Sequence, residues 1–134
     1  MTDLCLDHIL IGVRDLGEAS RTYSERLGFN LTPEGRHPGR GTHNRLAVFG
    51  PDYLELIAIH DKSLPAFRAE LPPFLESREG LFMFAIGTPD IETAAAAARA
   101  NGTEVGEIRA GRREASDGAP AYTWRYADIG DATP

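Results

Sequence analysis

The chain has 134 residues, the length of about one domain, and 42% hydrophobic against 25% charged residues, a globular balance. Acidic residues outnumber basic ones by 20 to 14, and the net charge of −6 argues against nucleic-acid binding, which needs a basic surface. No apolar run reaches the roughly 20 residues of a membrane helix, and no signal peptide is recognisable. With Cys5 as the one cysteine, no disulfide forms within the chain, so we expect a cytoplasmic protein without nucleic-acid or membrane partners.

Residues 1–60 predict one strand, one helix and three further strands. The short apolar run Leu4–Val13 indicates the first strand. Asp15 has the features of a helix N-cap, and the helix is expected to end at Gly28. The three further strands are expected at Phe29–Thr32, Arg45–Phe49 and Tyr53–Ile59, with a glycine-rich loop over Glu34–Asn44.

Residues 81–134 predict a shorter set of elements after a connector over residues 61–80. The three prolines of the connector leave room for one short helix, around Ala66–Glu70. A strand is expected at Leu81–Thr88, and Asp90 then begins a helix that runs to Ala100. Two strands follow, Glu104–Ile108 and Tyr122–Ala127, separated by a charged loop over Arg109–Pro120.

The two halves of the chain repeat each other. Several residues of the first strand and helix match residues 75 positions further on: Gly12 and Gly87, Asp15 and Asp90, Leu16 and Ile91, Ala19 and Ala94. The first unit has the order β-α-β-β-β, whereas the second has β-α-β-β and no clear fourth strand.

The strongest candidates for chemistry are His8 and Glu55, each in an apolar strand. A lone histidine in a strand is more often a hydrogen-bonded structural residue than a ligand. A buried carboxylate, however, needs a partner, which is a metal ion, an arginine or a network of donors. Arg45 faces the same side as Glu55 if Gly50–Asp52 is a tight hairpin turn, so a salt bridge and a metal site both remain open.

Other residues are open to two interpretations. His37 and His43 flank the glycine-rich loop, which is either a surface turn or an anion cradle, and His60 is expected to be solvated. The basic residues Arg109, Arg112 and Arg113 indicate either a solvated loop or a site that recruits an anionic ligand. Tyr122 and Trp124 share a strand face that serves core or dimer packing, or forms the wall of a ligand site.

Several sequence strings resemble the vicinal oxygen chelate superfamily, which includes glyoxalase I, extradiol dioxygenases and bleomycin-resistance proteins. They are LDHILIGVRDL (Leu6–Leu16), RLGF (Arg26–Phe29) and YLELIAI (Tyr53–Ile59). The segment GRHPGRGTHNRLAVFG (Gly35–Gly50) is similar to the glyoxalase-like domain family. The resemblance implies an α+β fold in which tandem βαβββ modules form a cupped mixed sheet. We expect a single domain over residues 1–134, with module one at 1–60, a connector at 61–80 and a module two at 81–134 that stops short.

The resemblance also implies a divalent metal, such as Zn, Fe, Mn or Ni, with His8 and Glu55 as ligands. In module two the position of His8 is taken by Met83, a poor ligand for these metals, and the second glutamate has no counterpart. Three explanations remain open. A loop histidine, His43 or His37, completes the site; a partner subunit supplies the missing strand; or the metal is lost and the cavity serves as a binding pocket.

Two classes of function follow from the resemblance. The first is a metal-assisted lyase, isomerase or dioxygenase, in which Glu55 is ligand or base and His43 moves a proton. The second is a metal-free protein of the bleomycin-resistance type that sequesters a small molecule. Its polar anchors would be Arg45 and Glu55, and its walls would be formed by Leu10, Ala47, Ile57, Met83, Tyr122 and Trp124. A third reading is a module whose main role is dimerisation, and in every case we expect a homodimer.

Overall fold

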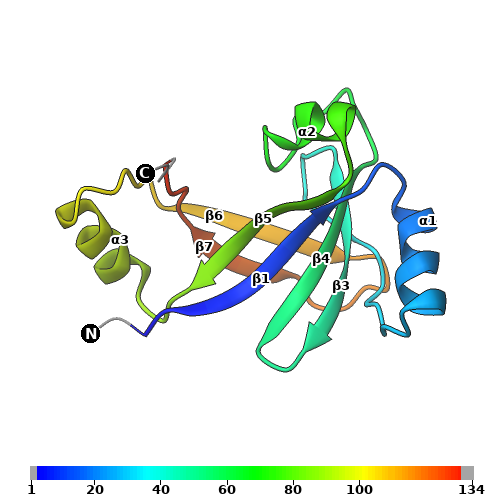
Figure 1. The fold of residues 1–134 in the computed structure, drawn as a ribbon, viewed down its shortest axis with the longest axis horizontal. Coiled ribbons are helices and arrows are strands. Elements are labelled where there is room, and N and C mark those ends of the chain that lie inside the picture. Colours follow the sequence, from blue (N-terminus) through cyan, green and yellow to red (C-terminus); the bar gives the residue numbers. More distant parts are fainter. Residues whose placement is uncertain (1–2, 131–134) are drawn as a thin grey trace.

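A curled mixed sheet organises residues 3–130, which are the residues that the computed structural model describes (Figure 1). The elements in chain order are β1 (Cys5–Gly12), α1 (Leu16–Arg21) with the π-helical turn η1 (Thr22–Arg26), β2 (Gly35–Arg36), β3 (Thr42–Phe49), β4 (Asp52–Ile59), α2 (Leu71–Ser77), β5 (Gly80–Gly87), α3 (Ile91–Ala100), β6 (Arg109–Ala115) and β7 (Tyr122–Tyr126). The seven strands described lie in the order β5-β1-β4-β3-β2-β6-β7. The predicted α+β fold with a cupped mixed sheet is confirmed.

The sheet has two distinct faces, because side chains alternate along each strand and directly paired residues share a face. The inner face carries Leu10 and Ile57, which form a buried cluster with Leu71 and Leu75 of α2. The outer face carries Leu56 and Ala58, which pack with Leu16 of α1. Leu56 and Ile57 are 1% and 0% exposed, so α1 and α2 seal the centre of the sheet from opposite sides. Burying each such side chain contributes about 2 kcal/mol.

The internal repeat is visible in the structure. Strands β1 and β5 begin and end 75 positions apart and pair antiparallel with each other. The helices α1 and α3 follow at the same offset. Their N-caps, Asp15 and Asp90, each accept a hydrogen bond from the backbone N–H three residues on, at Glu18 and Thr93. In the first unit β4 pairs parallel with β1, whereas beyond β7 the described residues form only one isolated bridge, between Val105 and Ile129.

Several local expectations differ from the structure. The strand expected at Glu104–Ile108 is reduced to an isolated bridge at Val105, and the loop expected at Glu34–Asn44 contains β2 and the start of β3. The loop expected at Arg109–Pro120 contains β6, which pairs with both β2 and β7. Its sequence lacks apolar alternation because its buried positions are Gly111 and Arg113. The strand expected at Phe29–Thr32 is reduced to an isolated bridge at Leu31. The connector helix is α2 rather than Ala66–Glu70, since prolines fit in the first turn, where the N–H groups have no helical partner.

None of the helices in residues 3–130 is long and apolar enough to cross a membrane.

Replacement of Asp15, the N-cap of α1, tests how much this cap contributes to the free energy of unfolding. We expect Asp15→Ala to lower the free energy of unfolding by about 1 kcal/mol, because the N–H of Glu18 loses its acceptor. Asp15→Asn keeps an acceptor oxygen and serves as the matched control. Urea denaturation measures both, and equal losses in the two variants would show that the cap is unimportant.

Candidate functional site

His8 and Glu55 meet on the inner face of the sheet. The parallel pairing of β1 with β4 sets Leu10 beside Glu55, and His8 lies two residues earlier on the same face. The His8 Nε2 atom lies 3.4 Å from Glu55 Oε2, and His8 Nδ1 lies 2.7 Å from Asp7 Oδ2. The imidazole stacks on the Tyr53 ring with a centroid separation of 4.4 Å. The two residues proposed from the sequence as metal ligands are therefore neighbours.

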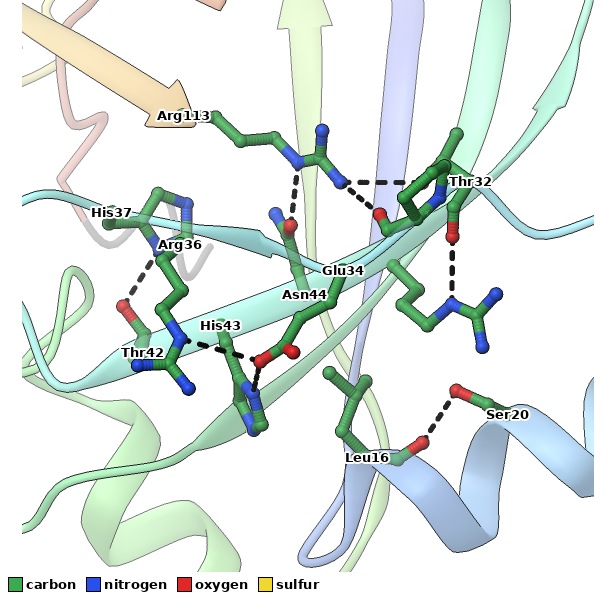
Figure 2. Close-up of polar contacts among 12 residues, drawn as sticks. Leu16, Ser20, Thr32, Glu34, Arg36, His37, Thr42, His43, Asn44 and Arg113 are labelled. Carbon is green, nitrogen blue, oxygen red and sulfur yellow. Dashed lines mark hydrogen bonds and ion pairs between the residues drawn. The ribbon is translucent and has the colours of Figure 1, made fainter. Parts of the chain in front are cut away.

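A chain of hydrogen bonds connects Glu55 to Arg113 through Asn44, and Figure 2 shows the link between Asn44 and Arg113. Asn44 Nδ2 donates to Glu55 Oε1 at 2.7 Å, and Arg113 Nε donates to Asn44 Oδ1 at 2.7 Å. The Arg113 guanidinium also donates to the carbonyl of Pro33 at 2.9 Å. The three side chains that these hydrogen bonds join, Glu55, Asn44 and Arg113, are all buried. The amide thus links a buried carboxylate to a buried cation.

A glycine makes room for this network. A Cβ placed on Gly35 of β2 would lie 2.2 Å from Arg113 Nε, so a side chain at this position would displace the guanidinium. Only the absence of a Cβ allows Arg113 to pass over β2 and reach Asn44 on β3.

The electrostatics favour an ionised pair. Burial alone would raise the pKa of Glu55, but the facing His8 imidazole and the hydrogen bond from Asn44 bring it below its ordinary value. Burial alone would lower the pKa of His8, but the facing Glu55 carboxylate and the hydrogen bond with Asp7 raise it. The same buried environment, with the carboxylate of Glu55 nearby, raises the pKa of the Tyr53 hydroxyl. The two shifts therefore both favour an imidazolium that faces a carboxylate, over a wider pH range than for the free side chains.

The structure brings together some of the predicted lining residues. Leu10 and Ile57 share the inner face with His8 and Glu55, but both are covered by α2. Met83 is half-buried and packs against that cluster. Trp124 belongs to a different group of rings, in edge contact with Phe67.

His43 and Arg45 lie on the outer face, away from Glu55. Only Gly50 and Pro51 separate the paired residues Phe49 and Asp52, so Leu46, not Arg45, shares the face of Glu55. The conditional expectation that Arg45 faces the same side as Glu55 is therefore wrong. His43 is hydrogen-bonded through Nδ1 to Glu34 (Figure 2).

The remaining histidines are enclosed. His37 is 3% exposed, hydrogen-bonds through Nδ1 to Thr42 Oγ1 at 2.8 Å, and stacks on Phe67. Burial lowers the pKa of His37. His60, expected to be solvated, instead buries its Nε2 atom with no hydrogen-bond partner among residues 3–130, and its ring lies beside that of His43.

The positions of His8, Glu55 and the other histidines show whether these side chains could together chelate a metal ion. Across residues 3–130, no group of three or more His, Cys, Asp and Glu side chains is arranged to hold a metal ion. His8 and Glu55 supply two donors, and Asp7 and Asn44 already engage the other atoms of both side chains. His37 and His43 are turned to other partners, so neither completes the set. The metal-donor side chains of residues 3–130 therefore do not fit the chelation of a divalent metal ion.

Comparison with known proteins identifies the family. The family model described as "Glyoxalase-like domain" matches residues 6–134. The chain belongs to the glyoxalase-like domain family. No curated protein matches the chain.

Several solved structures share the fold of this chain. A hypothetical protein from Staphylococcus aureus superposes with a TM-score of 0.78 at 18% identity, covering 98% of this chain and 54% of that one, so this chain spans about half its length. A methylmalonyl-CoA epimerase from Streptomyces coelicolor has a TM-score of 0.65 at 22% identity, with 81% of this chain and 86% of that chain covered. The corresponding epimerase from Mycobacterium tuberculosis has a TM-score of 0.63 at 24% identity, with 81% and 77% covered. Identities this low establish the fold alone.

The sequence analysis missed two residues of the site. Asn44 lies at the end of the predicted loop, and Arg113 belongs to the basic residues that indicate either a solvated loop or a site for an anionic ligand. The need of a buried carboxylate for donors was recognisable, but not which strands would supply them. An arginine flanked by small and charged residues carried no signal of burial.

Removal of the Arg113 guanidinium tests the network. We expect Arg113→Met to lower the free energy of unfolding by about 2 kcal/mol, because Asn44 and Pro33 lose their donors while remaining in the buried region. Arg112 is the matched control, since it is exposed and pairs only with the exposed Glu114. Arg112→Met should change stability by less than about 0.5 kcal/mol. Equal effects in urea denaturation would mean that the buried network contributes nothing.

The His8–Glu55 pair predicts a pH dependence of stability. Because folding raises the pKa of His8, its contribution is complete below pH 6.5, the ordinary value, and is lost as the pH rises through the raised pKa. Because folding lowers the pKa of Glu55, its contribution is lost only when the pH falls below the ordinary value of 4.5. Above pH 6.5 the free energy of unfolding should therefore fall with pH in the wild type, and less steeply in His8→Asn. Denaturation at several pH values measures the slopes, and identical slopes would contradict the pairing.

Proposed function

We propose that this chain binds a small molecule on the inner face of its half-barrel, with the His8–Glu55 pair as polar anchor and without a chelated metal. The observation that carries the proposal is the loose contact inside the pair. The 3.4 Å between His8 Nε2 and Glu55 Oε2 is longer than a direct N–H···O bond of about 2.7–3.2 Å. A hydroxyl or carbonyl group of a ligand can therefore interact with the imidazole without breaking a strong bond.

Access to this anchor is from the side of His8. The His8 side chain is 17% exposed, whereas that of Glu55 is 8% exposed. A ligand would thus contact His8 and the stacked Tyr53 ring first, and Glu55 would act through the imidazole. Of the residues predicted as walls, Met83 and Trp124 are half-buried and stay candidates, whereas Leu10 is covered by α2.

Proton transfer is a second candidate function for the same pair. An imidazole held between two carboxylates, those of Asp7 and Glu55, can accept or donate a proton near neutral pH. Fold neighbours include methylmalonyl-CoA epimerases, one of them in complex with methylmalonyl-CoA and NH4+. The separation of His43 from Glu55 leaves His43 outside this chemistry. Cytoplasmic location and a homodimer complete the proposal on the grounds of the sequence.

The first experiment decides between a metal-dependent and a metal-free site. Protein purified without an affinity tag or chelator is incubated with zinc, iron, manganese or nickel, desalted and analysed for metal content. We expect no stoichiometric ion, because among residues 3–130 only His8 and Glu55 could donate to a metal ion at this place. A stoichiometric ion that is lost in both His8→Ala and Glu55→Ala would overturn the metal-free proposal.

A ligand screen on the same protein tests binding itself. Small hydroxy and oxo compounds are screened by thermal shift, and hits are repeated on His8→Ala and on His60→Gln, a histidine on the outer face. We expect stabilisation to be lost in His8→Ala and kept in His60→Gln. Hits that stabilise His8→Ala as strongly as the wild type would place the site elsewhere.

A further inference from the structure

A separate polar hollow lies on the outer face of the sheet, beside α1. Its volume is about 210 Å³, and its lining residues come from α1, from β3 and from the segment before β2: Leu16, Gly17, Ser20, Glu34, His43 and Arg45. His43 and Arg45 pair with Ala58 and Leu56, the residues against which α1 packs. The hollow is thus on the opposite side of the sheet from His8 and Glu55, and it does not depend on the proposed function.

The negative side of the hollow is formed by Glu34. The Glu34 side chain forms ion pairs with His43 Nδ1 and Arg36 Nε, and both use the oxygen Oε1. Within residues 3–130, Oε2 therefore has no hydrogen bond or ion pair. The hydrogen bond to His43 holds the pKa of Glu34 below its ordinary value, so the carboxylate is charged at neutral pH.

The positive side is formed by Arg45. Its Nε donates to the carbonyl of Thr32 at 2.7 Å, which fixes the orientation of the guanidinium. The two terminal amino groups make no hydrogen bond to residues 3–130, so the fork that matches a carboxylate remains available. Ser20 donates its hydroxyl proton to the carbonyl of Leu16 at 2.6 Å and keeps its lone pairs for a ligand.

We infer that this hollow binds a small zwitterion of the amino-acid type. The ligand carboxylate would bind the two terminal amino groups of the Arg45 guanidinium, and its ammonium group would bind Glu34 Oε2. A simple anion would be repelled by Glu34, and a simple cation by Arg45. The volume of about 210 Å³ holds several times the roughly 30 Å³ of one water molecule but is smaller than a pocket for a drug-sized ligand, so the side chain must be small.

The test compares three small probes, one zwitterion, one anion and one cation. L-alanine, acetate and methylammonium are titrated into ¹⁵N-labelled protein at constant ionic strength, and the amide shift of Gly17 is followed. We expect a saturable shift with alanine, and binding at least about tenfold weaker for the two singly charged probes. No saturable shift with alanine, or acetate binding as tightly as alanine, would overturn the inference.

Matched variants locate the effect. Arg45→Gln and Glu34→Gln should each weaken alanine binding by about tenfold. Arg109→Gln and Glu107→Gln make the same charge changes at exposed positions outside the hollow and should leave binding unchanged. Peak dispersion reports whether each variant is folded. If Arg45→Gln does not fold, Arg45→Lys keeps the charge without the fork and should also weaken binding. Unchanged affinity in either folded Arg45 variant would refute the site.

Discussion

The carboxylate of Glu55, buried at the centre of the sheet, is the constraint on which the rest of the structure depends. An ionised carboxylate out of water is destabilising by several kcal/mol unless donors surround it. Here they come from three directions: His8 on β1, Asn44 on β3 and, through Asn44, Arg113 on β6. One residue of the first repeat thereby fixes the position of a strand of the second. The strand order sets β2 between β3 and β6, and it is across β2 that Arg113 reaches Asn44, so the sheet and the polar site on its inner face depend on each other.

The alternation of side chains along β3 places two different polar groups on opposite faces of the sheet. Asn44 points to the inner face and completes the donor set of Glu55, whereas its neighbours His43 and Arg45 point to the outer face beside α1. A one-residue shift in the β3–β4 hairpin would exchange these sets and leave Glu55 facing a guanidinium. The two-residue turn Gly50–Pro51 fixes this register, and Gly50, with a φ of 88°, adopts the left-handed conformation that the turn requires. The turn therefore determines that Asn44, and not His43 or Arg45, lies on the same face as Glu55.

Sequence reasoning succeeded where the signal is local. The capping residues Asp15 and Asp90 give both helix starts and the repeat, because a cap depends only on the next three residues. The sequence also predicts that a buried Glu55 needs a partner. It does not predict which residues are the partners, because Asn44 and Arg113 are 69 residues apart and meet only through the order of the strands. Strand β6 was taken for a loop for a related reason: its side chains satisfy a buried carboxylate network rather than an apolar core.

The first strand and the helix start of the two repeats correspond, but their chemistry differs. His8 of β1 and Met83 of β5 occupy matching positions on neighbouring antiparallel strands. His8 faces the carboxylate of Glu55, while Met83 packs against the apolar cluster of Leu10 and Ile57. A symmetric pair of histidines would bring two imidazoles and a second buried carboxylate to the inner face, which needs either a cation or a second donor network. A thioether at one of the two positions removes that need, since it is apolar and adapts to its neighbours. One polar anchor, His8, and one half-buried apolar residue, Met83, follow from this substitution, and the ligand that we propose for this face would have a polar end and an apolar body.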